Sequence, residues 1–449
     1  MQIKLPIHTG QKLPAVSAAD TDYTWVVSSH RPPLAAYESI YRQIHTNPEL
    51  SGQESQTARL AVTHLRSLSA FTVHANVGGH GVVGLLRNGP GPTVLLRADM
   101  DALPMLEKTG LPYASTKRMI DTADGVEKPV MHGCGHDVHV ACLMAASTLL
   151  HSARRHWSGT LITVFQPSEE RAGGAQGMVD SGLYSNLVPK PDYVLAQHVS
   201  PMPAGTVGVV SGPCLAANDT LNVRIKGRGG HGSAPQRCID PVVLGCGIVT
   251  KLQTIVSREV APDETAVVTC GSIRAGDAPN IIPDYLDFSV SIRTFNQSVR
   301  EKILAAVKRI VENECKAATD GVAGEDEDLT PVITHDDPYP PTINSPELAS
   351  SLSTAFADYF GARRCVPITA QMASEDVSVF ATAVGAQLCM WVLGGTDLKK
   401  WKDAERRGRL EEEIPGNHSS GFGPVIQPTI LTGTDALAVA ALRAFDSST

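Results

Sequence analysis

The sequence predicts an α/β protein built in two parts, and three observations carry this prediction. The chain has 449 residues, more than one compact core usually holds, so we expect two domains. Buried strands alternate with helices near both ends of the chain, a pattern typical of a mostly parallel, mixed sheet covered by helices. The middle of the chain follows the order strand, helix, strand, strand, helix, strand instead. This βαββαβ order predicts an inserted ferredoxin-like domain.

The bulk composition is that of a folded globular protein. Hydrophobic residues make up 42% of the chain and charged residues 19%, which argues against disorder. The formal net charge is -8 and there is no basic stripe, so neither nucleic acid nor a membrane is an expected partner. The N-terminus has no apolar run typical of a signal peptide, and no run is long enough to span a bilayer. The 9 scattered cysteines are then expected to be reduced thiols in a cytoplasmic protein.

The first part of the larger domain is expected over residues 1–214. It opens with an irregular arm up to about Pro33 and a helix over 34–46, and a later helix over 138–156 has one apolar face. Three buried strands end in polar side chains. These side chains are Asp99, Asp101, Glu169, Glu170 and His198. Because ligands bind beyond the carboxyl ends of parallel strands, their convergence is the first functional signal.

The inserted domain is expected over residues 215–338, and the second part of the larger domain over 339–449. The predicted elements of the insert are strands 220–226, 266–274, 285–294 and 329–335 and helices 240–258 and 298–319. An acidic stretch, 321–328, is expected to be a solvated turn, and 336–342 a stiff proline-rich exit. Helices 345–360, 375–384 and 429–444 and strand 387–393 complete the larger domain.

The densest group of reactive side chains lies in MHGCGHDVH, residues 131–139. Cys134 and His136 are two residues apart on a loop just before a helix, so they can bind one ion from adjacent positions. Thiolate and imidazole are ligands that zinc and its first-row neighbours prefer. The alternative is a glycine turn with a buried cysteine and satisfied histidines. It explains any one of these residues more simply than it explains the group.

A second group lies in QPSEE, residues 166–170. Two adjacent carboxylates after a buried strand point in different directions. One can therefore bind a metal while the other stays free as a general base toward bound water. The residues alone do not decide which of Glu169 and Glu170 does which. The alternative is an acidic helix start that Ser168 caps.

Two histidines complete the candidate ligands. His198 ends a predicted strand, and His418 lies among small residues in GNHSSGF. Each of them alone is more simply a core or surface-loop histidine. Together with Cys134, His136 and Glu170, however, they make five ligands, too many for one tetrahedral ion. The set suits two ions ~3.5–4 Å apart.

Aspartates beside these ligands are expected to support them. Asp99 and Asp101 in RADMDALP would bind metal or orient its ligands, although Asp99 also fits a capping aspartate at a strand–helix turn. Asp137, which follows His136 directly, is expected to orient ligands in the same way as Asp101.

The motifs together resemble the aminoacylase and indole-acetyl-amino-acid amidohydrolase branch of the dinuclear metallopeptidases. They run in the order RQIHTNPELSGQE, RADMDALP, MHGCGHDVH, QPSEE, GRGGHGSAP, APNIIPD, SEDVSVF and NHSSGF. They span roughly residues 35–445. The ordered set is highly specific, whereas no single member is.

The resemblance implies a metal-dependent amidohydrolase that cuts the amide bond of N-acyl amino acids or related amide conjugates. It implies that two divalent metal ions, of zinc or of manganese or cobalt, are bound by Cys134, His136, Glu170, His198 and His418. Glu169 would be the general base that helps to form a metal-bridged hydroxide and then protonates the leaving amine.

Three residues of the inserted domain acquire roles from the same resemblance. His231 would reach the active site, most simply that of a partner subunit, and stabilise the tetrahedral oxyanion. Asn280 and Arg293 are candidate ligands for the carboxylate of the substrate, since an arginine fork binds a carboxylate bidentately. For Arg293 a surface charge on an exposed strand face is an equally open alternative. A homodimer formed through the inserted domains is expected.

Other functions remain open at this point. The nearest is a dipeptidase or carboxypeptidase that acts on free peptides with the same metals. A non-catalytic, metal-dependent binder of acylated ligands is disfavoured because it needs no free base such as Glu169. A scaffold with one structural zinc leaves His198 and His418 unexplained. The charged stretch 397–416 and the segment after His418 differ from relatives, which leaves the acyl specificity open.

Overall fold

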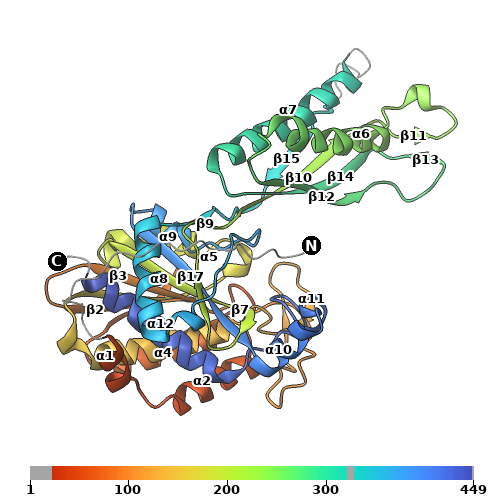
Figure 1. The fold of residues 1–449 in the computed structure, drawn as a ribbon. Helices are drawn as coiled ribbons and strands as arrows, with labels where there is room; N and C mark the ends of the chain where they lie inside the picture. The colour runs from red at the N-terminus through yellow and green to blue at the C-terminus, as the bar shows by residue number, and fades with distance from the viewer. Residues whose placement is uncertain (1–22, 321–327, 447–449) are drawn as a thin grey trace.

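The computed structural model describes residues 23–320 and 328–446 of the chain. Figure 1 shows two bodies: a larger one that contains both ends of the described chain, and a smaller one, drawn mostly in green, that stands away from it. We call the larger one the main body and the smaller one, residues 217–335, the inserted unit. The chain passes from the main body into the inserted unit and returns.

A seven-stranded sheet forms the centre of the main body, in the order β1-β2-β6-β3-β7-β17-β8. Its strands are β1 (Thr72–Val77), β2 (Gly81–Asn88), β3 (Thr93–Asp99), β6 (Gly159–Gln166), β7 (Tyr193–Pro203), β8 (Val207–Val209) and β17 (Gln387–Thr396). The central strands β6, β3, β7 and β17 run parallel, and β2 and β8 pair antiparallel with them on either side. The predicted mixed, mostly parallel sheet is confirmed.

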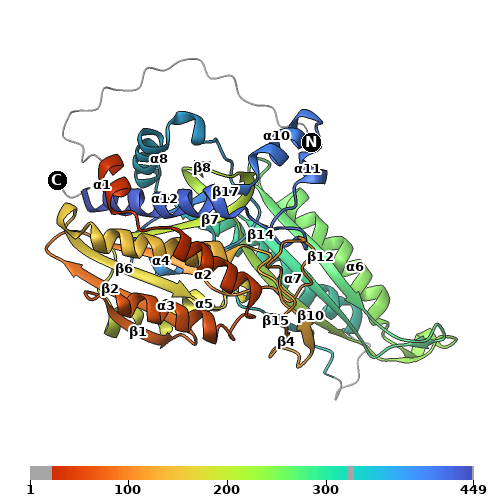
Figure 2. The same cartoon turned by 90° about the horizontal axis from the view of Figure 1, so that it is seen from below.

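Helices cover both faces of this sheet, as the views in Figures 1 and 2 show. The helices of the main body are α1 (Tyr23–His30), α2 (Ala35–Thr46), α3 (Ser55–Ser67), α4 (His136–Ser152), α5 (Gly174–Asp180), α8 (Pro346–Phe360), α9 (Ser378–Thr382), α10 (Leu398–Arg406), α11 (Leu410–Glu413) and α12 (Ile426–Asp446). Alternate residues of β3 serve the two faces. Val94 and Leu96 pack with α2, α4 and α12, and Leu95 packs with α5 and α9.

Helix α4 does not have the single apolar face that the sequence indicated. Its residues are buried without a break from His136 to Ser147. The reason is that α4 packs on β3 and β7 of the sheet and is also packed against α2, α3 and α12. A helix enclosed in this way is hydrophobic all round, so no polar face is required.

The inserted unit is a four-stranded antiparallel sheet, in the order β12-β14-β10-β15, with two helices on one face. Its elements are β10 (Ala217–Lys226), α6 (Pro241–Thr254), β12 (Ala266–Arg274), β14 (Tyr285–Thr294), α7 (Gln297–Thr319) and β15 (Val332–His335). The buried strand residues, such as Val223 and Phe288, pack against Ile248 of α6 and Ile310 of α7. The ferredoxin-like prediction is confirmed.

Two segments link the inserted unit to the main body, and they pair with each other. Strands β9 (Gly212–Leu215) and β16 (Thr342–Asn344) form an antiparallel ribbon. Farther along, Asn218 and Tyr339 exchange two backbone hydrogen bonds of 3.0 and 2.9 Å. The entry and the exit of the inserted unit therefore lie side by side.

Small two-stranded ribbons decorate both bodies. They are β4 (Arg118–Ile120) with β5 (Glu127–Pro129), and β11 (Gly230–His231) with β13 (Ile281–Ile282). The first belongs to the main body, and the second forms an extension at the far end of the inserted unit (Figure 1).

Several expected boundaries were wrong. The expected irregular arm contains helix α1 in its described part, and residues 1–22 lie outside the described residues. β7 continues to Pro203, so His198 lies inside a strand and not at its end. The helix expected over 375–384 is limited to Ser378–Thr382, which leaves Glu375 in a loop. The acidic stretch expected to be a turn falls, except for Asp328, outside the described residues.

Sequence analysis named no element between residues 47 and 92, where the structure has α3, β1 and β2. Among the described helices, none has both the length and the apolar character that crossing a bilayer demands.

Candidate active site

Side chains that can bind metals converge at one edge of the main sheet, where β3 and β6 end and α4 begins. Four overlapping groups place their ligand atoms within 4.8 Å of one another. The groups are Asp99, His136, His139 and His198; Cys134, Glu170 and His418; His136, Glu169 and Glu170; and Glu169, Glu375 and Asp376. The structure thus brings together all the side chains that the sequence offered as metal ligands, with Glu169 beside them.

The loop that carries Cys134 is held by close backbone approach. Gly135 has a φ of 81°, and a Cβ there would lie 2.4 Å from Cγ1 of Val199, so this position requires glycine. Asn417 donates from Nδ2 to the carbonyl oxygens of Cys134 and Val199, at 3.1 and 3.0 Å. The Sγ of Cys134 lies 3.4 Å from Nε2 of His198. The cysteine loop, β7 and the segment of Asn417 are therefore fixed together.

Glu169 and Glu170 begin a single-turn helix, η2 (Glu169–Arg171), just after β6. Oε1 of Glu170 lies 3.2 Å from Nε2 of His418 and 3.9 Å from Nε2 of His136. It therefore belongs to two of the groups. Oε2 of Glu169 lies 4.0 Å from Nε2 of His136. The two carboxylates do point to different neighbours, as their adjacency predicted.

Asp101 contacts both a ring and a backbone in this cluster. Its Oδ1 lies 3.3 Å from Nδ1 of His136. Its Oδ2 accepts hydrogen bonds from Oγ of Ser51 at 2.6 Å and from the backbone N–H of Glu170 at 3.0 Å. This geometry fits the expectation that Asp101 orients the ligands.

Asp99 and His139 form a buried pair that sequence reasoning did not assign. Nδ1 of His139 lies 2.5 Å from Oδ1 of Asp99, and the backbone N–H of Val199 donates to Nε2 of His139 at 2.8 Å. Because Nε2 already accepts, Nδ1 carries the proton and donates it to Asp99. The signal was available, since His139 follows His136 by three residues and so shares its side of α4.

Arg97, Glu375 and Asp376 were also missed. Arg97 is buried in β3, and its guanidinium lies 2.8 Å from Oδ2 of Asp99, 2.7 Å from Oε1 of Glu375 and 3.2 Å from Oδ1 of Asp376. Two signals pointed to them: Arg97 is a lone charge in a buried strand, and SEDVSVF offers a second pair of adjacent carboxylates.

The cluster carries more negative than positive charge. Its carboxylates are Asp99, Asp101, Glu169, Glu170, Glu375 and Asp376. Within the described part of the chain, Arg97 is the one arginine or lysine that forms ion pairs with them. Buried charges of one sign are unfavourable unless they are compensated, so the site attracts cations.

The electrostatics of the site follow from this burial. Burial raises the pKa of the Glu169 carboxyl well above its ordinary value, and the neighbouring Glu375 and Glu170 carboxylates raise it further. Hydrogen bonds to Cys134 and Glu170 raise the pKa of His418 to about 10. Burial lowers the pKa of His198, whose Nδ1 donates to the carbonyl oxygen of Val199 at 2.8 Å. Nε2 of His198 then carries no proton, so its lone pair is available to a metal ion, and it faces Cys134.

A cavity of about 530 Å³ opens above these groups. Its floor is made by Cys134, Glu169, Glu170, His198 and His418. Its other walls are made by Ser200, Cys214, Leu215, Asn218, Arg293, Tyr339, Gln371, Ala373, Ser374, Met390, Trp391, Val392 and Asn417. The cavity thus combines a polar, acidic floor with a partly apolar wall.

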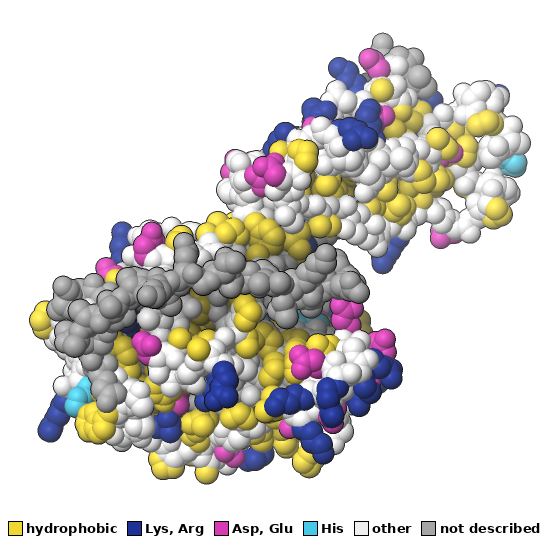
Figure 3. Space-filling model, in the orientation of Figure 1, with side chains coloured by type: hydrophobic (Ala, Val, Ile, Leu, Met, Phe, Trp, Pro, Cys, Tyr) yellow, Lys and Arg dark blue, Asp and Glu magenta, His cyan; other side chains and the backbone are white. Residues whose placement is uncertain are grey.

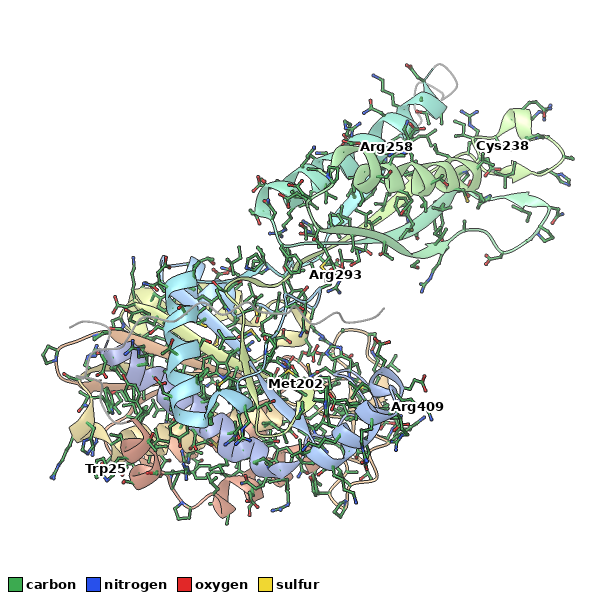
Figure 4. The ribbon with its side chains drawn as sticks, in the orientation of Figure 1. Trp25, Met202, Cys238, Arg258, Arg293 and Arg409 are labelled. Carbon is green, nitrogen blue, oxygen red and sulfur yellow. The ribbon has the colours of Figure 1, made fainter. Side chains whose placement is uncertain are left out.

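Arg293 lies at the junction of the two bodies, as Figure 4 shows. It is half-buried, and its Nη1 donates to the carbonyl oxygen of Met372 at 2.5 Å and to Oγ of Ser374 at 3.2 Å. It therefore faces the cavity, and the alternative of a charge on an exposed strand face is wrong.

His231 and Asn280 are not brought to the cavity of their own chain. Both are exposed and lie by the β11–β13 extension, where the backbone N–H of Gly232 donates to the carbonyl oxygen of Asn280. In Figure 4 the label of Cys238, which lies against Gly230 of the same extension, marks the end of the inserted unit remote from the main body. In this arrangement, neither residue can bind a substrate in the cavity of its own chain.

Asp137 does not support the ligands in the way expected. Its Oδ2 lies 2.6 Å from Nδ1 of His45 on α2, and its Oδ1 accepts from the backbone N–H of Val138. The carboxylate points away from the cluster because the side chains of His136 and Asp137 leave α4 in different directions. Asp137 thus ties α4 to α2.

The family is decided by the match of the whole pattern. The model of one protein family, described as peptidase family M20/M25/M40, matches residues 95–406. The chain belongs to this peptidase family. The resemblance inferred from the motifs is therefore confirmed.

Relatives within the M20/M25/M40 family cover most of the chain. It is 36% identical to a hippurate hydrolase of Campylobacter jejuni over 77% of this chain and 84% of that protein. It is 35% identical to thermostable carboxypeptidase 2 of Saccharolobus solfataricus over 76% and 81%. It is 35% identical to IAA-amino acid hydrolase ILR1-like 2 of Arabidopsis thaliana over 77% and 74%.

A solved structure of the same family has the same fold. The YXEP protein of Bacillus subtilis, described as a dinuclear metal binding peptidase of the M20 family, superposes with a TM-score of 0.68. The match covers 92% of this chain and 98% of that protein at 25% sequence identity.

The residues of this M20/M25/M40 member fit a divalent cation. Nε2 of His136 and Oε1 of Glu170 are buried without a hydrogen-bond partner among the described residues. Orphaned lone pairs of this kind are costly in a protein interior. A donor set of thiolate, imidazole and carboxylate suits zinc and its first-row neighbours.

Proposed function

We propose that this protein is a metal-dependent amidohydrolase that cuts the amide bond of N-acyl amino acids or related conjugates. The observation that carries the proposal is the position of Glu169. Its carboxylate lies beside the candidate ligands His136 and Glu170, in a cavity that Arg293 also lines. Hydrolysis of an amide that also bears a carboxylate needs a base next to a cation site and a cationic group, here Arg293, to bind that carboxylate.

In this proposal Cys134, His136, Glu170, His198 and His418 would hold two divalent metal ions. Glu170 lies in two of the ligand groups, one with Cys134 and His418 and one with His136 and Glu169. When bound, the ions supply Lewis acidity toward the amide carbonyl and toward water. The thiolate of Cys134 favours zinc slightly, while manganese and cobalt also suit these ligands.

Glu169 is the proposed general base. Its carboxylate lines the cavity beside the ligand groups, where it can accept a proton from the attacking water. It then holds that proton within reach of the amide nitrogen and releases it to the leaving amine. Asp101 keeps the ring of His136 and the backbone of Glu170 in place during these transfers.

Arg293 is the proposed anchor for the carboxylate of the substrate. Its guanidinium is now bonded to the carbonyl oxygen of Met372 and to Ser374, and it exchanges these neutral partners for a charged one when the substrate binds. Bonds from a guanidinium to a carboxylate are stronger than those to neutral acceptors. This anchor fits an N-acyl amino acid, which has one free carboxylate and no free amine.

We propose further that the protein is a homodimer, with His231 and Asn280 serving the cavity of the partner. Their exposed position far from their own cavity supports this. Apolar side chains are exposed on the inserted unit: Val243 (70%), Val267 (40%), Ile273 (47%) and Ile281 (58%). Figure 3 shows hydrophobic side chains along this unit. Such a surface is typical of a protein interface.

The test is hydrolysis of N-acyl amino acids and free dipeptides by metal-replete enzyme, with Glu169→Gln and Glu170→Gln alongside and the metal content measured on all three. We expect Glu169→Gln to keep about two ions and to lose at least ~100-fold in kcat/KM. Glu170→Gln should lose an ion as well as activity, because it removes a ligand.

Three results would count against the proposal. Parental activity in Glu169→Gln would remove the base from the mechanism. Hydrolysis of free dipeptides alone would make the protein a peptidase, in line with the carboxypeptidase among its relatives. A parent that binds metal and acylated ligands but hydrolyses nothing would be a binding protein.

A further inference from the structure

The turn that carries Glu169 is strained and depends on outside contacts. Ser168 and Ala172, on either side of η2, have φ values of 56° and 58°. This left-handed region is unfavourable for residues other than glycine. The turn is also tight, since a Cβ on Gly174 would lie 1.7 Å from the carbonyl oxygen of Pro167. Strain of this kind persists where the surroundings enforce it, commonly at functional sites.

Three of these outside contacts come from the main body. Oε1 of Glu54 accepts from the backbone N–H of Ser168 at 2.9 Å, and Oδ2 of Asp101 accepts from that of Glu170 at 3.0 Å. Arg171 is paired with the buried Asp121. These residues belong to the same body as the turn, so they hold it whatever the inserted unit does.

A fourth contact comes from the linker to the inserted unit. The hydroxyl of Tyr339 donates to the backbone carbonyl oxygen of Glu169 at 2.9 Å. The backbone of Tyr339 pairs with Asn218, near the start of β10 of the inserted unit, so this side chain stands where the chain leaves that unit. Its ring also lines the cavity beside Glu169. The contact reaches the residue of the proposed base itself, through its main chain.

We propose that Tyr339 is a positioning residue that holds the Glu169 turn to the linker, so that the placement of the base carboxylate depends on how the inserted unit is seated. This inference rests on the proposed role of Glu169. The physical reason is that the hydrogen bond from Tyr339 fixes the backbone carbonyl of Glu169. The orientation of this peptide group in turn sets the direction of the Glu169 side chain. Movement of the inserted unit about its paired linkers then changes how well the base is aimed.

Tyr339→Phe tests the proposal, because it removes one oxygen atom and keeps the ring. A net loss of one hydrogen bond in the transition state predicts a fall in kcat of about ten-fold, with KM within about two-fold of the parent. The matched control is Tyr184→Phe, which removes an equivalent bond of 2.8 Å from a phenol to the carbonyl oxygen of Phe380, outside the cavity lining. Its kcat should stay within about two-fold of the parent.

Two further measurements separate positioning from other roles. Tyr339→Phe in the Glu169→Gln background should cause no further loss, because residues that act through one another are not additive. Amide hydrogen exchange over residues 168–175 should be faster in Tyr339→Phe than in Tyr184→Phe or the parent. This second readout does not depend on activity and applies even where Tyr339→Phe is unstable.

Several outcomes would overturn the inference. A rise in KM with kcat unchanged would make Tyr339 a substrate contact, and losses that multiply with Glu169→Gln would make it independent of the base. Unchanged exchange over 168–175 would show that the hydroxyl does not hold the turn. If Glu169→Gln itself keeps parental activity, the proposed function has failed, whereas the exchange result still decides whether Tyr339 restrains the turn.

Discussion

Neighbouring side chains in this site differ in what they touch, and that difference sets their tasks. Glu170 lies 3.2 Å from His418, whereas Glu169 shares a group with Glu375 and Asp376; both carboxylates approach His136. The same contrast separates Asp101 from Asp137. The first contacts His136, and the second contacts His45 on α2. Proximity in sequence to a ligand does not imply support of that ligand.

Asp101→Asn and Asp137→Asn provide a test of this contrast. Asp101→Asn should lower metal affinity by about 10–100-fold, because it weakens the contacts to His136 and Glu170. Asp137→Asn should leave metal affinity within about three-fold and lower the stability by about 1–3 kcal/mol, since it removes a buried carboxylate partner of His45. Competition with a chelating dye and thermal unfolding of the metal-loaded variants measure the two effects. Equal losses of affinity in both variants would contradict the assignment.

At the residue scale, sequence reasoning found the candidate ligands because cysteine, histidine and carboxylate residues gather in short glycine-flanked motifs. It missed Glu375 and Asp376 because the predicted helix over 375–384 hid them, whereas the structure leaves them in a loop beside Arg97. It misassigned Asp137, since spacing along the chain does not tell which side of α4 a carboxylate leaves.

At the scale of elements, a buried charge network joins α2 to α4. His45 on α2 lies between Asp137, at 2.6 Å, and Glu107, at 3.1 Å. Burial opposes the charged form of His45, but the hydrogen bonds to both carboxylates outweigh it and raise the pKa of His45 from 6.5 to about 9. The position of the helix that begins with His136 therefore depends on a protonated histidine.

This network predicts a loss of stability in alkali. A group whose pKa is raised on folding stabilises the folded state fully below its ordinary pKa of 6.5 and loses that effect as the pH rises through about 9. The contribution of His45 should therefore reach about 3 kcal/mol at pH 6 and vanish above pH ~9.5. His45→Gln should accordingly cost much more stability at pH 6 than at pH ~9.5. Denaturant unfolding of parent and variant at both values measures this, and a cost that does not depend on pH would contradict it.

Strands and helices were predicted best where burial alone defines them. β14 begins and ends where the sequence placed it, because every second residue of it is buried. The bounds of β12 were also predicted, although Val268 is its one buried residue. β7 was cut short at His198, since the sequence shows a polar residue there. In the structure β17 pairs with β7 beyond that point and extends it to Pro203. The partner strand decides where a strand ends, and the residues of the strand itself do not show which partner it has.

At the scale of the whole molecule, the inserted unit separates two sets of residues that the proposed mechanism needs. Arg293 stands at its near end, in the cavity (Figure 4), and His231 lies in β11, at its far end (Figure 1). The order of elements in the chain was enough to predict the insertion and its ferredoxin-like fold. The distance between His231 and its own cavity was not predictable from the order of elements, because it depends on how the unit stands on its linkers.

Subunit complementation tests whether His231 acts in a partner. His231→Ala and Glu169→Gln should each be nearly inactive alone. When they are co-expressed, half of the dimers are mixed, and one of the two sites in each mixed dimer has both intact residues. The mixture should then recover about one quarter of the parental activity. Activity assays on the co-purified pair measure this. No recovery, with mixed dimers demonstrated by differential tags, would exclude a role in trans.

The pairing of the two linker strands bears on how such a protein can be built and rebuilt. Asn218 and Tyr339 form an antiparallel bridge, so the chain enters the inserted unit and leaves it at neighbouring positions. With respect to the main body, the whole inserted unit is a long loop that connects two paired strands, as the turn of a β-hairpin does. Excising it would require a short turn and no new crossing, and the entropy of closing the remaining chain is small because its ends are already in register. A different domain of any length could be inserted at the same position, provided that its own termini lie close together.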